Sequence, residues 1–499
     1  MWTIALKLIE FIYTISVVGL TAYGLHNLFL VILYWRRKNQ PTLPNVADST
    51  PPPAQDWPAV TIQLPLYNER YIVERLLDSV VKLDYPREKI QIQVLDDSTD
   101  STIKMTSRLV QHYQNQGIQL QLIRRSNREG YKAGALSEGL KTATGDIIAV
   151  FDADFIPPTD WLIRTVPAFR DPKLGCLQTR WVHLNKNLSP LTRAEALALD
   201  GHFIVEQAAR SRNGLFLNFN GTAGLWRRKT IEDAGSWQSD TLTEDLDLSY
   251  RAQMRGWKIG YLPDVVVAAE LPAQLEAFKQ QQFRWAKGTV QTVKKLLPKF
   301  LSADLSWKVR LFGLGHLGAY FASPLMLGMF LFLLPIGYFA PDFLRHVPSL
   351  PFAAFGPPLL YLVARTESTP RITDRLRSLP LLILLGFGLT LNNTIAVNEG
   401  FSGKGGDFVR TPKYNLVGSK GKWKTNNYNF PLNPMVIGEF TLAAYAILSV
   451  ILLIPKAGWG ITPWLLVFAV GNLYMAGANI WQHRNMAKTR SRLNPSMAI

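Results

Sequence analysis

Long apolar runs stand at both ends of the chain, with a block of mixed apolar and polar residues between them. The first run covers residues 10–34 and is followed at once by Trp35-Arg36-Arg37-Lys38. Five further runs lie at residues 311–338, 351–365, 378–396, 435–455 and 461–481. A helix of about 20 apolar residues is long enough to cross a bilayer. The pattern therefore predicts an N-terminal membrane helix and a C-terminal helical bundle on either side of the central block.

The polar residues beside these runs predict the orientation of the chain. Basic residues come after the first run, the reverse of their order in a signal peptide, so we expect an uncleaved span whose C-terminal end lies in the cytosol. The basic loop 403–424 and the basic C-terminus both fall in the cytosol only if one later run does not cross. Residues 378–396, which contain Asn-Asn-Thr at 392–394, suit a helix in the membrane interface. We therefore predict five spans, counting the first.

The central block, residues 59–270, alternates short apolar segments with helical patterns. We expect strands at Ala59–Leu64, Ile90–Leu95, Ile118–Ile123, Ile147–Phe151 and Leu174–Thr179, and helices at Ile72–Val81, Thr102–Gln114 and Tyr131–Thr142. This alternation favours an α/β domain with a largely parallel sheet. The preceding segment, residues 41–58, is rich in proline and predicts a linker without packed structure.

Charge and cysteine content narrow the class of partner. The formal net charge is +17, but much of the excess lies beside apolar segments, at residues 36–38, 404–424 and 484–492. This placement fits the positive-inside rule and anionic lipid headgroups, and a basic cleft would also suit a diphosphate. We therefore expect membrane lipids as partners and no nucleic acid. The single cysteine, Cys176, excludes an internal disulfide and suits a reducing compartment.

Polar clusters follow the first two predicted strands, at the edge where an open α/β sheet binds ligands. Tyr67 and Glu69 follow the first strand, and Asp96 and Asp97 follow the second. A tyrosine ring and a carboxylate could hold a nucleobase and its ribose. The structural alternative is an Asx turn or a helix cap, which an isolated Asp-Asp-Ser sequence favours.

A third acidic cluster ends the strand Ile147–Phe151. Asp152 and Asp154 are separated by one small residue, and their hard oxygen ligands suit Mn²⁺ or Mg²⁺ together with substrate phosphates. Lys132 begins a predicted helix and could meet a nucleotide phosphate there, although a solvated surface lysine is the alternative. These acidic clusters and Lys132 together predict a donor site for a nucleotide sugar.

Two motifs further on suggest an acceptor side. Thr243-Glu244-Asp245 opens a helix; the spacing of Thr241 and Glu244 matches a capping box, which explains Glu244 and leaves Asp245 as a candidate general base. Asn220-Gly221-Thr222 is small and polar, so its backbone could approach a carbohydrate closely or simply form a tight turn.

The sequence Gln281-Gln282-Phe283-Arg284-Trp285 lies just before the second apolar region. In a helix over Leu275–Leu297, the side chains of Gln281, Arg284 and Trp285 share one face. An amide, a guanidinium and an indole can hydrogen-bond, neutralise a phosphate and stack on a sugar ring. An amphipathic surface helix is the alternative. Together with the acidic clusters upstream, the motif indicates a nucleotide-sugar transferase that feeds a membrane.

The set of motifs and its order resemble a known family. The chain is similar to the processive membrane glycosyltransferases of family 2, of the cellulose synthase type, and most closely resembles the plant cellulose-synthase-like mannan and glucomannan synthases. The resemblance runs through Val94–Asp100, Gly130–Leu136, Phe151–Phe155, Val205–Gln207, Phe219–Gly224 and Gln281–Trp285. It is close over residues 58–300 and loose in the membrane part.

The resemblance implies an α/β GT-A-type (Rossmann-like) cytosolic glycosyltransferase domain inserted in an α-helical transmembrane domain. The implied parts are a first transmembrane helix (1–38), a Pro-rich linker (39–58), a catalytic domain (59–272), interfacial helices with the Gln-x-x-Arg-Trp motif (273–310), a transmembrane domain (311–482) and a basic cytosolic tail (483–499). The transmembrane domain includes the interfacial helix 378–396 and a gating-like loop, 400–430.

The resemblance also implies roles for single residues. The nucleotide-binding set is Tyr67, Glu69, Asp96, Asp97, Lys132 and Asp152, and the metal-binding set is Asp152 and Asp154. The catalytic set is Asp245 as base with Glu244, Arg284 on the pyrophosphate and Trp285 stacked on the acceptor sugar. The acceptor-binding set is Asn220, Gly221, Thr222, Gln281 and Trp285. The family's gating loop, Phe-x-Val-Thr-x-Lys, corresponds to Phe408, Thr411 and Lys413, with Arg410 in place of valine.

The implied reaction is a direct displacement at the anomeric carbon of UDP-glucose or GDP-mannose, with Mn²⁺ or Mg²⁺ as cofactor. It would elongate a β-linked polysaccharide of the mannan, glucomannan or glucan type and export it across a plasma, inner or Golgi-type membrane. The nearest alternative is a non-processive glycolipid glycosyltransferase that adds one hexose to a membrane lipid. A transporter or binding scaffold explains the spans but not the acidic motifs in catalytic order.

Overall fold

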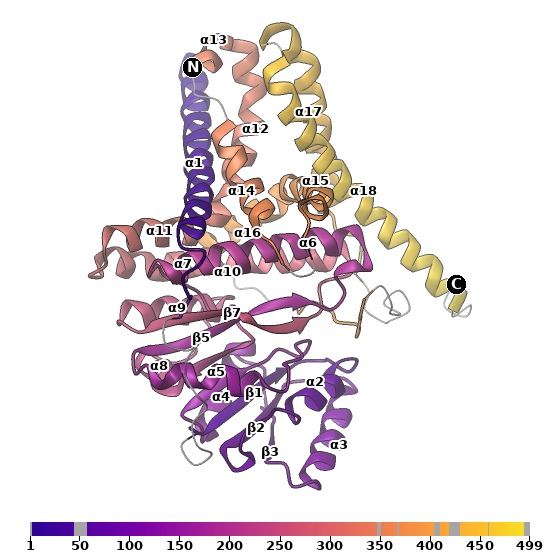
Figure 1. Cartoon of the computed structure of the whole chain (residues 1–499). Helices are drawn as coiled ribbons and strands as arrows, with labels where there is room; N and C mark the ends of the chain where they lie inside the picture. Colours follow the sequence, from indigo (N-terminus) through magenta and orange to yellow (C-terminus); the bar gives the residue numbers. More distant parts are fainter. Residues whose placement is uncertain are drawn as a thin grey trace.

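The computed structural model of the protein describes residues 2–43, 57–346, 351–366, 369–403, 410–418, 430–457 and 459–493. A helical bundle stands on a domain built around one β-sheet, and long helices lie between the two (Figure 1). The N-terminal helix α1 (Trp2–Arg36) belongs to the bundle, and its C-terminal end lies next to the sheet domain. There Arg37 Nη1 donates to the Arg212 carbonyl at 2.6 Å.

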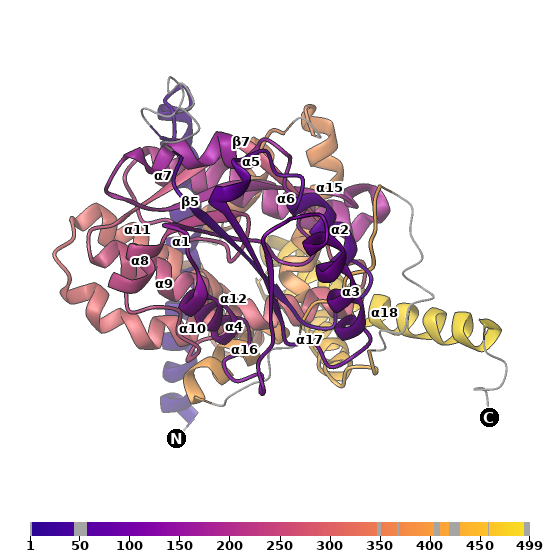
Figure 2. The same cartoon turned by 90° about the horizontal axis from the view of Figure 1, so that it is seen from below.

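The sheet domain alternates strands and helices, as the sequence predicts. Its strands are β1 (Val60–Leu66), β2 (Ile90–Asp96), β3 (Leu120–Ile123), β4 (Ile147–Val150), β5 (Leu174–His183), β6 (Gly224–Arg227) and β7 (Lys258–Ala269). Its helices include α2 (Val73–Val80), α3 (Thr102–Gln114), α4 (Tyr131–Thr142), α5 (Trp161–Thr165), α8 (Arg228–Asp233) and α9 (Glu244–Met254). The strand order is β3-β2-β1-β4-β6-β5-β7, and the strands run side by side when seen from below (Figure 2).

The sheet differs from the prediction in two ways: it contains two further strands, β6 and β7, and β6 runs in the opposite direction to its neighbours. β6 runs antiparallel to both of its neighbours, β4 and β5, so the sheet is mixed. β6 is only four residues long and begins with a glycine, while β7 contains Gly260 and Pro263. Glycine and proline interrupt the apolar alternation by which strands are recognised. The sequence therefore did not predict β6 or β7.

The two faces of the central strands are buried in different ways. On β1, Val60, Ile62 and Leu64 are fully buried in an apolar cluster. On the opposite face, the buried Gln63 donates to the Gln93 side chain of β2 at 3.0 Å. A buried amide needs such a partner, because an unmade hydrogen bond costs about 1–3 kcal/mol. The hydrogen-bonded pair thus lets both faces of β1 be covered.

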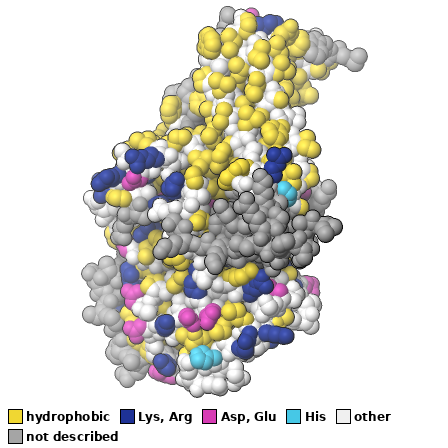
Figure 3. Space-filling model, turned by 90° about the vertical axis from the view of Figure 1, so that its right-hand side faces the viewer, with side chains coloured by type: hydrophobic (Ala, Val, Ile, Leu, Met, Phe, Trp, Pro, Cys, Tyr) yellow, Lys and Arg dark blue, Asp and Glu magenta, His cyan; other side chains and the backbone are white. Residues whose placement is uncertain are grey.

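Four helices among the described residues are long and apolar enough to cross a membrane: Thr3–Arg36, Ala319–Phe339, Met435–Lys456 and Trp459–Met486. A fifth candidate is the bent pair α15 (Ile372–Gly388) and α16 (Thr390–Ser402), whose axes meet at 46°. Apolar side chains cover the visible face of the bundle, and charged side chains gather on the lower half of the molecule (Figure 3). This distribution suits a bundle that contacts lipid.

The membrane segments predicted from sequence correspond to this bundle with two differences. The run at 351–365 forms α14 (Pro351–Val363), a helix of 13 residues, which is shorter than the four candidate spans. The run at 378–396, which we expect in the interface, is broken between α15 and α16. Figure 1 places α14, α15 and α16 at the base of the bundle, above α6 (Pro190–Asp200) and α10 (Leu275–Ser302).

Helix α10 (Leu275–Ser302) joins the sheet domain to the bundle. Lys279 Nζ lies 2.5 Å from Glu439 Oε1 of α17 (Met435–Ala457), and neither side chain is exposed. Asn479 of α18 (Thr462–Leu493) donates to Glu276 Oε2 at 2.8 Å. A buried ion pair is costly to break, because the remaining charge is left without compensation. These contacts fix α10 against α17 and α18.

We expect Glu439→Gln to lower the unfolding temperature, because it leaves the Lys279 ammonium buried without a counter-charge, a loss of about 3–5 kcal/mol. The matched control is Glu232→Gln, which removes the half-exposed partner of Arg228 and costs about 0–1 kcal/mol. Thermal unfolding of both variants in detergent measures the difference. Equal unfolding temperatures for the two variants contradict the role assigned to the pair.

Candidate active site

The carboxyl ends of β1, β2 and β4 meet at one edge of the sheet. β1 pairs in parallel with both β2 and β4. Tyr67 directly follows β1, Asp97 directly follows β2, and Asp152 lies just beyond β4. Side chains from three neighbouring strands therefore converge at the edge where open α/β sheets bind their ligands.

Asn68 ties the loops after β1 and β2 together. Its backbone has φ 57°, its N–H donates to Ser98 Oγ at 2.8 Å, and its Oδ1 accepts from the Thr99 N–H at 2.8 Å. The neighbouring Tyr67 ring lies under the Arg128 guanidinium, with 3.4 Å between its centroid and the guanidinium carbon. A cation over an aromatic face is an attractive contact that orients the ring. Tyr67 is thus held, half-buried, at the edge of the site.

The two aspartates at the end of β2 have different surroundings. Asp96 is buried, accepts from the Ser98 N–H at 3.1 Å and pairs with Arg124 at 3.1 Å, which is the geometry of the structural Asx turn. Asp97 accepts from Arg125 through both carboxylate oxygens, with the Nε atom at 3.0 Å. A bidentate pair fixes a carboxylate firmly. The nucleotide-binding roles of both aspartates stay predictions.

Lys132 lies inside the site rather than on the surface. Its side chain is 13% exposed, and its Nζ lies 2.5 Å from Asp152 Oδ1 and 3.9 Å from Glu244 Oε1. Nζ also donates to the Gly221 carbonyl at 3.0 Å. Burial opposes the charged form, but the two carboxylates outweigh it and raise the pKa of Lys132. The ammonium group therefore joins three segments of the chain.

The small polar loop after Phe219 closes over this lysine. Gly221 has φ 83°, and a Cβ there would lie 3.0 Å from Asp245 Oδ2 and 3.4 Å from Lys132 Nζ. The Asp152 N–H donates to Thr222 Oγ1 at 2.8 Å. Only glycine adopts this conformation without strain and leaves room for the carboxylate. The loop thus links the predicted donor side to the predicted base.

The start of α9 differs from the predicted capping box. The N-cap is Thr243, and no side chain caps the helix, so the interpretation of Thr241 and Glu244 as a capping box is wrong. The Thr243 hydroxyl instead lies 3.1 Å from the hydroxyl of Thr292 on α10. The carboxylate of Glu244 is thereby left to face Lys132.

Asp245 is the second residue of α9 and is half-buried. Burial and then the charge of Glu244 raise the pKa of Asp245 to about 7, although Lys132 and Arg284 act in the opposite direction. A carboxylate that titrates near neutral pH can take a proton from a hydroxyl group and release it again. The environment of Asp245 suits the predicted general base.

Helix α10 carries the remaining predicted residues. Gln281, Arg284 and Trp285 are all half-buried. Burial lowers the pKa of Arg284, while the carboxylates of Glu244, Asp152 and Asp245 act in the opposite direction. The Arg284 guanidinium therefore interacts electrostatically with the same three carboxylates as the Lys132 ammonium. The structure brings the motif on α10 to the carboxyl edge of the sheet.

Residues 410–418, a described segment within the gating-like loop, also pack against this edge. Lys413 Nζ lies 2.7 Å from Asp154 Oδ2. The Glu270 carboxylate accepts from two backbone N–H groups of the segment, at 2.7 and 2.9 Å. Arg410 pairs with Glu69 at 2.9 Å. Thr411 is half-buried, and Phe408 lies outside the described residues.

The sequence does not predict that Arg125 and Glu270 belong to this site. It also does not predict the ion pair between Arg410 and Glu69. Glu270 directly follows β7, which is the same acid-after-strand pattern that pointed to Asp152. That signal was hidden, because β7 was not recognised as a strand.

Burial raises the pKa of Glu69 to about 7, against the charge of Arg410.

Asp152 and Asp154 offer the hard oxygen atoms that Mn²⁺ and Mg²⁺ prefer. Asp152 is paired with the Lys132 ammonium, and Asp154 is paired with the Lys413 ammonium. Each carboxylate therefore lies in a position that favours a cation. Across the described part of the chain, no third histidine, cysteine or acidic side chain completes a group with them. The pair therefore fits a cation whose remaining ligands come from a bound diphosphate.

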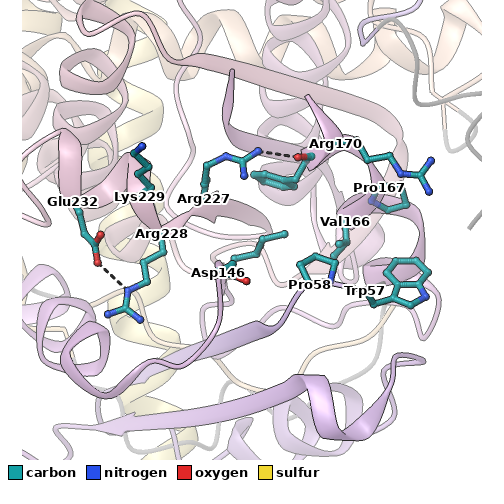
Figure 4. A pocket seen from close by; sticks show the side chains of 12 residues that line it. Trp57, Pro58, Asp146, Val166, Pro167, Arg170, Arg227, Arg228, Lys229 and Glu232 are labelled. Carbon is teal, nitrogen blue, oxygen red and sulfur yellow. Dashed lines mark hydrogen bonds and ion pairs between the residues drawn. The ribbon is translucent and has the colours of Figure 1, made fainter. Parts of the chain in front are cut away.

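Two cavities flank the sheet. One of about 290 Å³ is lined by Lys132, Glu244 and Gln291, beside the site just described. A larger one of about 670 Å³ opens at the amino end of β4, where Arg228 pairs with Glu232 and Arg227 donates to a main-chain carbonyl (Figure 4). None of the predicted site residues lines the larger cavity. The converging titratable groups, rather than the size of the cavity, identify the site.

The fold and the site together define a glycosyltransferase domain. Residues 58–288 match the family model described as "Glycosyltransferase like family 2". The fold is shared with the mannosyltransferase PcManGT from Pyrobaculum calidifontis, solved with GDP-Man and Mn²⁺, at a TM-score of 0.51 and 22% identity, over 79% of this chain and 100% of that chain. The central domain is therefore similar to the glycosyltransferases of family 2 and has the GT-A fold, as the resemblance implied.

The curated relatives of the chain include plant glucomannan 4-beta-mannosyltransferases. "Probable glucomannan 4-beta-mannosyltransferase 11" of Oryza sativa is 43% identical over 250 residues, which is 49% of this chain and 44% of the relative. "Glucomannan 4-beta-mannosyltransferase 2" of Arabidopsis thaliana is 39% identical over 274 residues, 54% of this chain and 51% of the relative. The matches thus span about half the length of these relatives. The resemblance to the cellulose-synthase-like mannan synthases is confirmed.

We expect Gly221→Ala to abolish turnover of nucleotide sugar, because the added methyl group meets the Asp245 carboxylate at 3.0 Å. Gly214→Ala is the matched control, since Gly214 has φ 63° but nothing within 4 Å of its Cβ position. Both variants lose about 1–2 kcal/mol from the left-handed backbone. Donor turnover and unfolding temperature are measured together, and an active Gly221→Ala protein contradicts the close approach of loop and base.

Proposed function

We propose that the protein is an inverting, processive glycosyltransferase that elongates a β-linked hexose polysaccharide of the mannan or glucomannan type from GDP-mannose and exports it through its own membrane helices. The observation that carries this proposal is the convergence of Lys132, Asp152, Asp245 and Arg284 at one sheet edge, below the membrane bundle. The names of the curated relatives support mannose over glucose as the donor sugar.

The donor side supplies positive charge for the leaving group. Lys132 and Arg284 are half-buried cations that share one group of carboxylates. Charge that develops on a departing diphosphate is stabilised by such preorganised cations. When bound, a divalent cation held by Asp152 and Asp154 would add further positive charge on the diphosphate oxygens. Tyr67 and Asp97, at the ends of β1 and β2, are placed to hold the nucleoside.

The acceptor side supplies a base. Asp245 takes the proton of an acceptor hydroxyl while that oxygen forms a bond to the anomeric carbon and the bond from this carbon to the diphosphate breaks. Attack and departure occur on opposite faces of the sugar, which converts an α-linked donor into a β-linked product. Trp285, which directly follows Arg284 on α10, is placed to stack on the acceptor sugar.

The membrane helices support the export part of the proposal. Arg37, directly after α1, donates to the Arg212 carbonyl of α7 (Ala208–Arg212), which lies between the bundle and the sheet domain, and basic residues at the end of a span favour the cytosolic side. We infer a multi-pass protein with its catalytic domain in the cytosol. Helix α10 then separates the site from the bundle, so a product released past Trp285 would meet α16 and α17.

We expect purified protein in nanodiscs with Mn²⁺ to make long material from GDP-mannose that β-mannanase digests. UDP-glucose supplied alone and digestion by β-glucanase serve as controls, and radiolabelled product is sized before and after each digestion. A single-sugar product that partitions into organic solvent indicates a glycolipid transferase instead. No turnover of either donor by folded protein contradicts the proposed function.

We expect the rate of transfer to rise with pH through about 7, because only the ionised form of Asp245 can accept a proton. Asp245→Asn is expected to lower kcat by about 10²–10⁴-fold. Glu244→Gln is expected to move the pH midpoint downward, since it removes a negative charge that raises the Asp245 pKa. A midpoint that stays in place in an active Glu244→Gln protein argues against Asp245 as the base.

A further inference from the structure

The helical stretch from residue 190 to 212 contains a rare element next to the small polar loop Asn220-Gly221-Thr222, which we call the acceptor loop. It consists of α6 (Pro190–Asp200), the π-helix η5 (Gly201–Gln207) and α7 (Ala208–Arg212). α6 and α7 lie between the sheet domain and the bundle (Figure 1). π-helical turns are uncommon and occur frequently at functional sites. The segment Val205-Glu206-Gln207 at the end of η5 has no role in the mechanism described so far.

A chain of hydrogen bonds runs from the main chain of the acceptor loop to Glu206, and its polarity can be assigned. The Asn218 carbonyl can only accept, so Gln207 Nε2, at 3.0 Å, is a donor. It also donates to Asn220 Oδ1 at 2.8 Å. Asn220 Nδ2 is therefore the donor to His202 Nε2 at 2.9 Å. The proton of a neutral His202 then lies on Nδ1 and is donated to Glu206 Oε2 at 2.9 Å.

The other end of this chain is anchored in the membrane bundle. Glu206 Oε1 accepts from Arg210 Nε at 2.9 Å. Arg210 is 1% exposed, and its Nη2 lies 3.2 Å from His26 Nε2 of α1, while Nη1 donates to the Phe312 carbonyl at 3.3 Å. Burial disfavours the charge of Glu206, but Arg210 and His202 outweigh it and lower its pKa well below the usual range. Glu206 is thus an ionised acceptor for both neighbours.

The loop held by this chain touches the reacting groups. Asn220 precedes Gly221, whose carbonyl accepts from Lys132 and whose Cα lies against Asp245. Both polar atoms of the Asn220 side chain are already engaged, by Gln207 and His202. The side chain therefore orients the loop together with Gln178, whose Oε1 accepts from the Asn220 N–H at 2.8 Å.

We propose that His202 and Glu206 are positioning residues that orient Asn220, and through it the acceptor loop, for sugar transfer. The inference rests on the proposed function, because it concerns the acceptor of that reaction. The donor-side contacts of the loop are made by Gly221 and Thr222 independently of the Asn220 amide. A change at Glu206 is therefore expected to affect the acceptor more than the donor.

The test is Glu206→Gln. Arg210 can only donate, so the oxygen of the introduced amide turns toward it and the amide nitrogen faces His202 Nδ1. His202 must then carry its proton on Nε2, where it meets the NH₂ group of Asn220, and two donors oppose each other. We expect sugar transfer to fall about tenfold, while the KM for the nucleotide-sugar donor and the slow hydrolysis of the donor by water stay unchanged.

The control and a second variant separate positioning from loss of structure. Asp200→Asn changes a buried carboxylate at the end of α6 and should keep the wild-type ratio of transfer to hydrolysis. Adding Asn220→Asp to Glu206→Gln gives His202 Nε2 an acceptor again and should recover part of the transfer. Proportional losses of transfer and hydrolysis, an unchanged Glu206→Gln protein, or no recovery in the double variant each overturn the proposal.

The failure of the proposed function is seen separately, because the wild-type protein is assayed first with GDP-mannose and UDP-glucose. If folded wild-type protein transfers no sugar from either donor, the function fails and this inference falls with it. If the wild-type protein transfers sugar and Glu206→Gln keeps the same ratio of transfer to hydrolysis, only the positioning role is refuted.

Discussion

The site depends on the compensation of closely spaced negative charges by Lys132. Asp152 lies in the loop after β4, whereas Glu244 and Asp245 begin α9, and the mutual repulsion of the three carboxylates would favour an open edge. The Lys132 ammonium, 2.5 Å from Asp152, holds them together and also binds the loop carbonyl of Gly221. Strand β4, helix α9 and the acceptor loop therefore take their relative places from one cation on α4.

Helix α10 extends this constraint to the membrane part. Its Arg284 faces the same carboxylates as Lys132, while its Lys279 forms a fully buried pair with Glu439 of α17. One side of α10 thus belongs to the catalytic edge and another to the bundle. A displacement of α17 along its axis would be transmitted to Arg284 through a single rigid helix.

Much of the fold could be predicted from sequence because strands and helices of the sheet domain keep strict periodicity. α3 and α4 have the predicted bounds, and β1, β2 and β4 differ from them by only a few residues. β6 and β7 could not be predicted, since a short strand with glycine and a strand with Pro263 lack that periodicity. The convergence of the acidic clusters followed from strand order. The Arg410–Glu69 and Lys413–Asp154 pairs did not, because nothing in the sequence indicates which distant cation meets which carboxylate.

The Lys413–Asp154 pair has a consequence for the biogenesis of the protein. The two residues are 259 positions apart, and the helices α10, α12 (Ala322–Phe339) and α16 lie between them in the chain. During synthesis, the sheet domain emerges long before Lys413, so Asp154 first exists without this partner. Contacts between such distant positions close late in folding. The edge of the catalytic domain is therefore completed only after membrane helices have been made, and a ribosome-bound chain that ends before residue 413 presents an unfinished site.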